Sequence, residues 1–73
     1  MKNNQIGIIG LGYWGTNIVN VLIKIGCNSI HCYDINQENL KEIKKKFPHI
    51  NIINKFNDFL DLKLDGVIIS TST

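Results

Sequence analysis

The residues with the clearest chemical purpose are three closely spaced glycines in residues 8–19, IIGLGYWGTNIV. Gly10, Gly12 and Gly15 form the pattern G-x-G-x-x-G between an apolar run and a segment of helical spacing. In this pattern the first glycine permits a tight turn, the second lets a pyrophosphate approach the backbone, and the third lets the helix pack closely on the strand. Free N–H groups at the positive end of the helix dipole then bind phosphate. The spacing therefore predicts a cradle for a dinucleotide.

An acidic residue at the usual distance completes the pattern. Asp34 follows the last glycine by about 20 residues and ends a second apolar run. Its carboxylate can accept hydrogen bonds from the adenosine ribose hydroxyls and would repel the 2′-phosphate of NADP. No arginine follows it, because Ile35 and Asn36 come next. We therefore expect NAD rather than NADP. The alternative to the whole site is a plain loop with chance glycine spacing, with Asp34 as a solvated strand-end acid or a turn residue.

Two aromatic residues lie inside the glycine motif. Tyr13 and Trp14 are either packing residues or cofactor contacts, and their backbone N–H groups can serve the pyrophosphate in both cases. Their side chains could close over the cofactor or mark a contact between domains.

The remaining titratable and sulfur-containing residues indicate no further chemistry. Cys27 and Cys32 lack partners at zinc-ligand spacing, so we expect small buried thiols and no metal. His31 lies in an expected strand and His49 follows a proline, and neither is expected to be functional.

Four short apolar runs are expected to form strands, over residues 5–10, 29–34, 51–54 and 67–70. Three helices are expected to alternate with them, which is typical of a parallel sheet covered on both faces. The nearly unbroken apolar runs agree with strands buried on both sides. We therefore predict an α/β fold, a Rossmann-type doubly wound parallel sheet that is partial, with about four strands in the order 3-2-1-4.

Residue types typical of helix starts and ends predict where the three helices begin and end. The first is expected over residues 13–25, ending at Gly26, with an apolar spacing set by Trp14, Ile18, Val21 or Leu22, and Ile25. Asn36 is a plausible N-cap for the second, which Pro48 ends, and Asn57 could cap a brief third helix. The buried face of the second helix is expected to comprise Leu40, Ile43 and Phe47.

Length and charge exclude several classes. A chain of 73 residues is at most one domain, and its net charge of +2 is small. The only lysine cluster, residues 44–46, falls late in a helix, where it complements the dipole, so no nucleic acid partner is expected. No apolar run approaches the ~20 residues of a membrane span, and no signal peptide is visible, so we expect a cytoplasmic protein without a membrane partner.

The motifs GLGYWG, YDIN and VIISTST together resemble the Gfo/Idh/MocA oxidoreductases, NAD(P)-dependent sugar and cyclitol dehydrogenases, over essentially the whole chain. The resemblance implies a pyrophosphate loop, two residues flanking the adenosine, and a segment lining the route to the nicotinamide ribose. In that order these are Gly10, Gly12, Tyr13, Trp14 and Gly15; Asp34 and Ile35; and Ser70, Thr71 and Thr73. Ser72 replaces the proline usual in the last segment.

The resemblance also places the catalytic lysine and the substrate domain in later sequence. Residues 1–73 are then expected to be the N-terminal part of a dinucleotide-binding domain, with the substrate domain absent and no activity alone. The parent would be a homo-oligomeric NAD-dependent oxidoreductase that moves a hydride between a sugar or cyclitol hydroxyl carbon and nicotinamide. The alternative from the residues themselves is a non-catalytic NAD-sensing or regulatory domain. A methyltransferase is disfavoured by Tyr13, Trp14 and the second half of the glycine motif.

Overall fold

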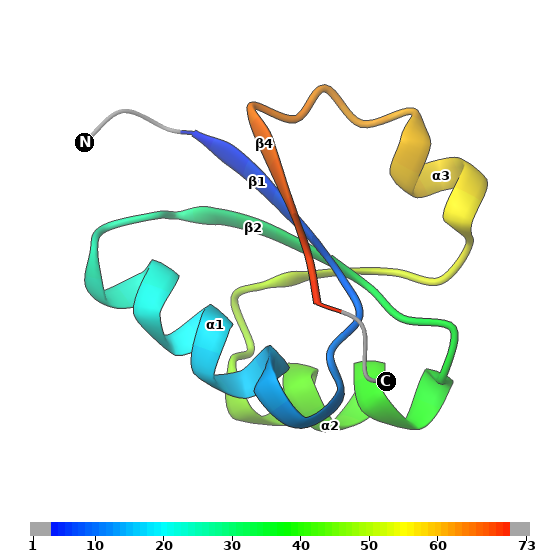
Figure 1. Ribbon diagram of the computed structural model, residues 1–73, viewed down its shortest axis with the longest axis horizontal. Helices are drawn as coiled ribbons and strands as arrows, with labels where there is room; N and C mark the ends of the chain where they lie inside the picture. Colours follow the sequence, from blue (N-terminus) through cyan, green and yellow to red (C-terminus); the bar gives the residue numbers. More distant parts are fainter. Residues whose placement is uncertain (1–3, 71–73) are drawn as a thin grey trace.

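The computed structural model describes residues 4–70. In this range strands and helices alternate along the chain, and the strands form one parallel sheet (Figure 1). The elements are β1 (Gln5–Ile9), α1 (Gly12–Lys24), β2 (Ser29–Tyr33), α2 (Gln37–Lys46), β3 (Asn51–Ile53), α3 (Phe56–Leu60) and β4 (Gly66–Ile69). No helix within this range is long and apolar enough to cross a membrane.

The sheet has the order β3-β2-β1-β4, as predicted. β1 pairs in parallel with both β2 and β4, so that Ile8 lies opposite Cys32 on one side and Ile68 on the other. The chain therefore builds outward from β1 to β3 and then crosses back to place β4 beside β1. The molecule is a partial Rossmann-type α/β fold.

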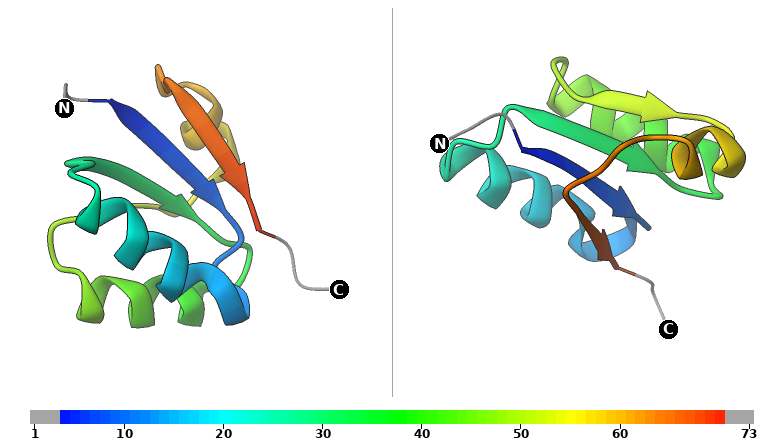
Figure 2. Two further views of the ribbon diagram at one scale, coloured as in Figure 1. Left: turned by 60° about the vertical axis from the view of Figure 1, so that its left-hand side comes forward. Right: turned by 90° about the horizontal axis from the view of Figure 1, so that it is seen from above.

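The two sides of the sheet are covered unequally. α1 and α2 lie against one face and the short α3 against the other (Figure 2). The core lies under α1 and α2, where strand residues such as Ile8 and Cys32 are fully buried. Both cysteines are free and buried, so the prediction that they are small buried thiols is confirmed. The members of this core are Ile8, Leu11, Val19, Cys27, Ile30, Cys32, Leu40, Ile43 and Ile50.

α1 ends at a glycine, as its sequence predicts. Gly26 has a φ of 92°, which glycine adopts without a steric cost. Its N–H donates to the carbonyl of Ile23 at 3.0 Å, and the N–H of Cys27 donates to that of Leu22 at 2.9 Å. This pair of bonds is the Schellman arrangement that satisfies the last carbonyls of a helix.

The buried face of α1 differs from the predicted spacing. Val19 is fully buried, whereas Trp14, Val21 and Ile25 are 60%, 56% and 57% exposed. Ile18 and Leu22 are half-buried against the core. Because apolar residues occur around most of this helix, periodicity alone fits two faces, and packing against the sheet selects the one centred on Val19.

α2 begins and ends as predicted. The Asn36 side chain accepts a hydrogen bond from the N–H of Glu38 at 2.9 Å, and Leu40 and Ile43 are buried. In the last turn, the Lys44 ammonium donates to the carbonyls of Pro48 at 2.8 Å and Ile50 at 2.6 Å. Lys44 therefore stabilises the turn that follows α2 by binding its carbonyl groups, which agrees with the prediction that this lysine belongs to the helix end.

α3 covers the opposite face through Phe59. This side chain is buried and forms a tilted ring pair with Tyr33 of β2, with centroids 6.3 Å apart. A Cβ at Gly7 of β1 would lie 2.6 Å from Phe59 Cζ and 2.6 Å from Leu64 Cδ1. The prediction that Asn57 caps this helix is wrong, because α3 starts at Phe56 with Lys55 as its N-cap.

β4 is less buried than its sequence predicts. Val67 is 47% exposed and Ile69 is 68% exposed, whereas Ile68 on the other face packs against the core. α3 lies over β2 and β3 rather than β4. The expectation of strands buried on both faces therefore fails for β4 within residues 4–70.

A buried histidine joins three strands on the face covered by α3. The ring of His31 contacts Gln5 Oε1 through Nε2 at 2.7 Å and Asn51 Nδ2 through Nδ1 at 3.2 Å. The neutral ring with its proton on Nε2 satisfies both contacts, donating to the first and accepting from the second. The His31 side chain therefore connects β1, β2 and β3.

We predict that acid weakens the fold through His31. Burial lowers the pKa of this ring from its usual 6.5, so the unfolded chain binds a proton that the folded chain excludes. Stability rises with pH wherever the unfolded state binds more protons, so the free energy of unfolding should fall between about pH 7 and about pH 5. Urea denaturation at several pH values measures it. His31→Gln should remove this dependence and the exposed control His49→Gln should keep it; the reverse result would contradict the assignment.

Candidate functional site

A groove of about 460 Å³ opens at the carboxyl ends of β1 and β2. This edge also holds Ser70, the residue that follows β4. In open α/β sheets ligands bind at the carboxyl ends of the strands, where the chain switches direction across the sheet. Here that point is β1, between β2 and β4. The described lining residues are Ile9, Gly10, Gly12, Tyr33, Asp34, Ile35, Asn36, Asn39 and Ser70.

The first two glycines form the turn between β1 and α1. Gly10 has a φ of 89°, a conformation that side chains disfavour, and its N–H donates to the Tyr33 carbonyl at 2.9 Å. Gly12 is the first residue of α1 and is exposed on the groove. The turn therefore brings the start of a helix to the groove without a side chain in between.

Gly15 lies in close contact with the loop residue before α1. A Cβ at this buried position would lie 3.0 Å from the Cβ of Leu11, and the Gly15 N–H donates to the Leu11 carbonyl at 3.1 Å. The third glycine therefore lets α1 close onto the loop residue that precedes it.

The starts of α1 and α2 differ electrostatically. α2 has a side-chain cap from Asn36 and an acidic residue, Glu38, in its first turn. α1 has neither a side-chain cap bond nor an acidic residue in its first turn, within the described residues. Asp34 lies beside this helix start, where its carboxylate accepts from the N–H of the N-cap residue Leu11 at 2.7 Å. The start of α1 itself still faces the groove, and a helix N-terminus favours an anion.

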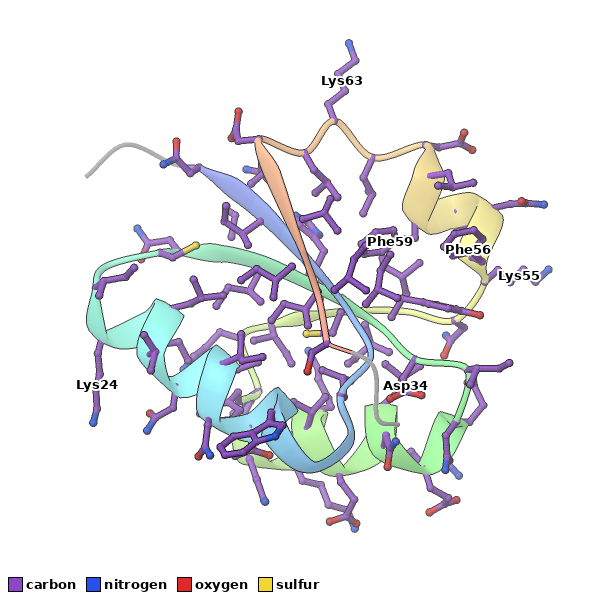
Figure 3. All side chains as sticks on the ribbon, in the orientation of Figure 1. Lys24, Asp34, Lys55, Phe56, Phe59 and Lys63 are labelled. Carbon is purple, nitrogen blue, oxygen red and sulfur yellow. The ribbon has the colours of Figure 1, made fainter. Side chains whose placement is uncertain are left out.

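Asp34 joins the glycine turn to α2. Its carboxylate, buried to 6% exposure, accepts from the Leu11 N–H at 2.7 Å and from Asn39 Nδ2 at 3.0 Å, both at Oδ2. Oδ1 accepts from the Asn36 N–H at 2.8 Å. Figure 3 shows the side chain where β2 runs into α2. The second apolar run and the glycine motif, separate in sequence, therefore meet at one carboxylate.

The hydrogen bonds keep this carboxylate charged. Burial by itself raises the pKa of Asp34. The hydrogen bonds from Asn36, Leu11 and Asn39 together lower the pKa by more than burial raises it, so the net pKa lies below the usual 3.8. Hydrogen bonds to a carboxylate favour its ionised form. Asp34 is therefore a negative charge at neutral pH, at the rim of the groove.

The predicted site residues are only partly brought together. Gly10, Gly12, Asp34, Ile35 and Ser70 line the groove. Trp14 and Gly15 do not line it, although both belong to α1. Of the others, the Tyr13 side chain, Thr71 and Thr73 lie outside the described residues.

Sequence reasoning missed Asn39 as a groove residue. It lies in the first turn of α2, five positions beyond Asp34, and contacts the Asp34 carboxylate. The available signal was its position in the first turn of the helix expected after Asn36, which begins directly after the strand that ends at Asp34.

Comparison with known proteins agrees with this geometry. Residues 5–72 match the family model described as the NAD binding domain of 6-phosphogluconate dehydrogenase. A search of curated proteins finds no significant match. The family match does not single out the Gfo/Idh/MocA oxidoreductases, but it covers every strand and helix described above and supports NAD as the cofactor. The chain therefore belongs to the family of NAD-binding domains typified by that of 6-phosphogluconate dehydrogenase.

Proposed function

We propose that this groove binds NAD for an oxidoreductase of the Gfo/Idh/MocA type, whose substrate is a sugar or cyclitol. The proposal rests on one observation: the glycine turn and an ionised, buried carboxylate meet at the carboxyl end of β1. That arrangement offers separate positions for a pyrophosphate and a ribose. The motif GLGYWG and the segment after β4 support the finer assignment through their resemblance to that family.

The pyrophosphate is assigned to the start of α1. Gly10 and Gly12 present backbone to the groove, and the backbone of Tyr13 and Trp14 continues the first helical turn. The positive end of the helix dipole favours the phosphate charge. Gly15 contributes indirectly, because it lets α1 close onto Leu11 and so shapes the loop.

The two ends of the cofactor are assigned to the flanking strands. Asp34 and Ile35, which follow β2, are placed beside the adenosine, with the carboxylate accepting from a ribose hydroxyl. Ser70, Thr71 and Thr73, which follow β4, are placed on the route to the nicotinamide ribose. β1, between these strands, carries the loop for the pyrophosphate that connects the two halves.

The lining of the groove favours NAD over NADP. Asp34 is negatively charged, and none of the described lining residues is basic. A 2′-phosphate would therefore meet a like charge with no compensating cation. When NAD is bound, its nicotinamide supplies the hydride acceptor for a hydroxyl-bearing carbon of the substrate.

We predict that Gly12→Val weakens NAD binding while leaving the fold intact. Gly12 is exposed, so a valine there displaces groove solvent rather than core side chains. Loss of one charge-assisted phosphate contact costs about 1.5–3 kcal/mol, which corresponds to a rise in the dissociation constant of about tenfold or more. Titration calorimetry of the full-length protein with NAD measures this change.

A matched control separates the groove from the helix. Asn20→Val places the same side chain on an exposed position of α1 away from the groove, and should bind NAD as wild type does. If Gly12→Val also binds NAD normally, the start of α1 is not part of the site. NAD binding by the wild type without turnover of any sugar or cyclitol would support a sensing or regulatory domain instead.

A further inference from the structure

The Asp34 carboxylate has unequal oxygens. Oδ2 accepts from the Leu11 N–H at 2.7 Å and from Asn39 Nδ2 at 3.0 Å, whereas Oδ1 accepts from the Asn36 N–H at 2.8 Å. A carboxylate oxygen accepts about two hydrogen bonds through its lone pairs. Oδ2 is therefore filled by the protein, and Oδ1 keeps one site for a ligand.

Two of these three donors belong to the backbone, and only one is a side chain. Leu11 and Asn36 donate N–H groups that any residue at those positions would supply. Asn39 is half-buried and lines the groove next to Asp34. Its amide is thus the only side-chain donor to the carboxylate that the described structure contains.

We infer that Asn39 is a positioning residue that sets the choice between NAD and NADP, by holding Asp34 so that Oδ1 is presented to the ribose. This inference rests on the proposed function of the groove. With Asn39 in place, Oδ2 accepts two bonds, and the carboxylate cannot rotate away from this orientation without breaking them. A ribose hydroxyl then finds an acceptor, and a 2′-phosphate finds a fixed negative charge.

Removal of the amide should change the two cofactors differently. In Asn39→Leu the carboxylate keeps its backbone donors but loses the side-chain bond that restrains rotation. NAD affinity should fall about five- to tenfold, as expected for weakening one hydrogen bond to a charged group. NADP affinity should change less than about twofold, because NADP uses no bond to this carboxylate. The preference for NAD should therefore fall by about the same factor as NAD affinity.

The test is titration calorimetry of the full-length protein with NAD and with NADP. Gln37→Leu is the matched control, since it removes an exposed amide from the same helix outside the groove lining, and it should keep the wild-type preference. Asn39→Ala serves if the leucine variant does not fold, because alanine favours helix and also lacks the donor. A purely structural role for Asn39 would weaken both cofactors equally and leave their ratio unchanged.

Different results would exclude NAD binding in the groove and the role of Asn39 in cofactor preference. If the wild type does not bind NAD, the proposed function fails and the role of Asn39 fails with it. If the wild type prefers NAD and both Asn39 variants keep that preference, the groove assignment stands and the role of Asn39 is wrong. A ligand-free readout adds to this: carboxyl NMR should show Asp34 titrating at higher pH in Asn39→Leu, and an unchanged titration would count against the positioning bond.

Discussion

Asp34→Ala is expected to weaken NAD binding by about ten- to several-hundredfold in the full-length protein. The change removes the ribose acceptor and also the acceptor that holds the Leu11 N–H beside the glycine turn. One hydrogen bond from a ribose hydroxyl to a charged carboxylate contributes about 1.5–3 kcal/mol, which corresponds to this range of dissociation constants. Discrimination against NADP should relax as well, because the charge that repels a 2′-phosphate is gone. Calorimetric titration with both cofactors measures the two effects together.

A second consequence of the same change concerns the fold. The Leu11 N–H is buried with Asp34, and an unpaired buried donor costs about 1–3 kcal/mol. Some loss of stability should therefore accompany the loss of affinity. Asp61→Ala removes an exposed carboxylate at the end of α3, outside the groove, and should alter neither property. NAD affinity that survives Asp34→Ala would exclude Asp34 from the site.

Gly7→Val is expected to destabilise the fold by about 3 kcal/mol. A Cβ at this position already falls 2.6 Å from Phe59 Cζ and from Leu64 Cδ1, and the valine methyls extend further. Leu64 is half-buried and can move, but Phe59 is 3% exposed and packs beside Tyr33. The short α3 would have to lift from the sheet. Overpacking of this kind costs about 3 kcal/mol.

That loss is large for a chain of this size, because total stability is only about 0.05–0.15 kcal/mol per residue. Urea denaturation measures it, with Gly66→Val as the control on the neighbouring strand. A Cβ at Gly66 meets only Ile6 Cδ1 at 3.6 Å, an ordinary contact, so this variant should stay within about 0.5 kcal/mol of wild type. Equal losses in the two variants would show that glycine is needed for strand geometry rather than for space above Gly7.

Local chemistry explains what could be predicted from the sequence about the fold. The helix ends at Gly26 and Asn36 depend on bonds within a few residues, so the residue types at those positions indicate them directly. The parallel direction of the strands follows from alternating apolar runs and helical periods, because parallel strands need crossover connections. The order 3-2-1-4 is the one expected of a Rossmann-type fold with this glycine motif. The proximity of Asp34 to the glycine turn was also expected, since both follow adjacent parallel strands.

The sequence by itself thus determined the element order, the partial Rossmann fold and the meeting of Gly10, Gly12 and Asp34 at one edge. Only the tertiary structure decided which face of α1 is buried, why Gly7 must lack a side chain, and which atoms fill Asp34 Oδ2. The physical reason is the range of the interactions. Caps and periodicity act between neighbours in sequence, whereas steric fit and the sharing of a carboxylate depend on residues that approach only after the sheet and helices have packed.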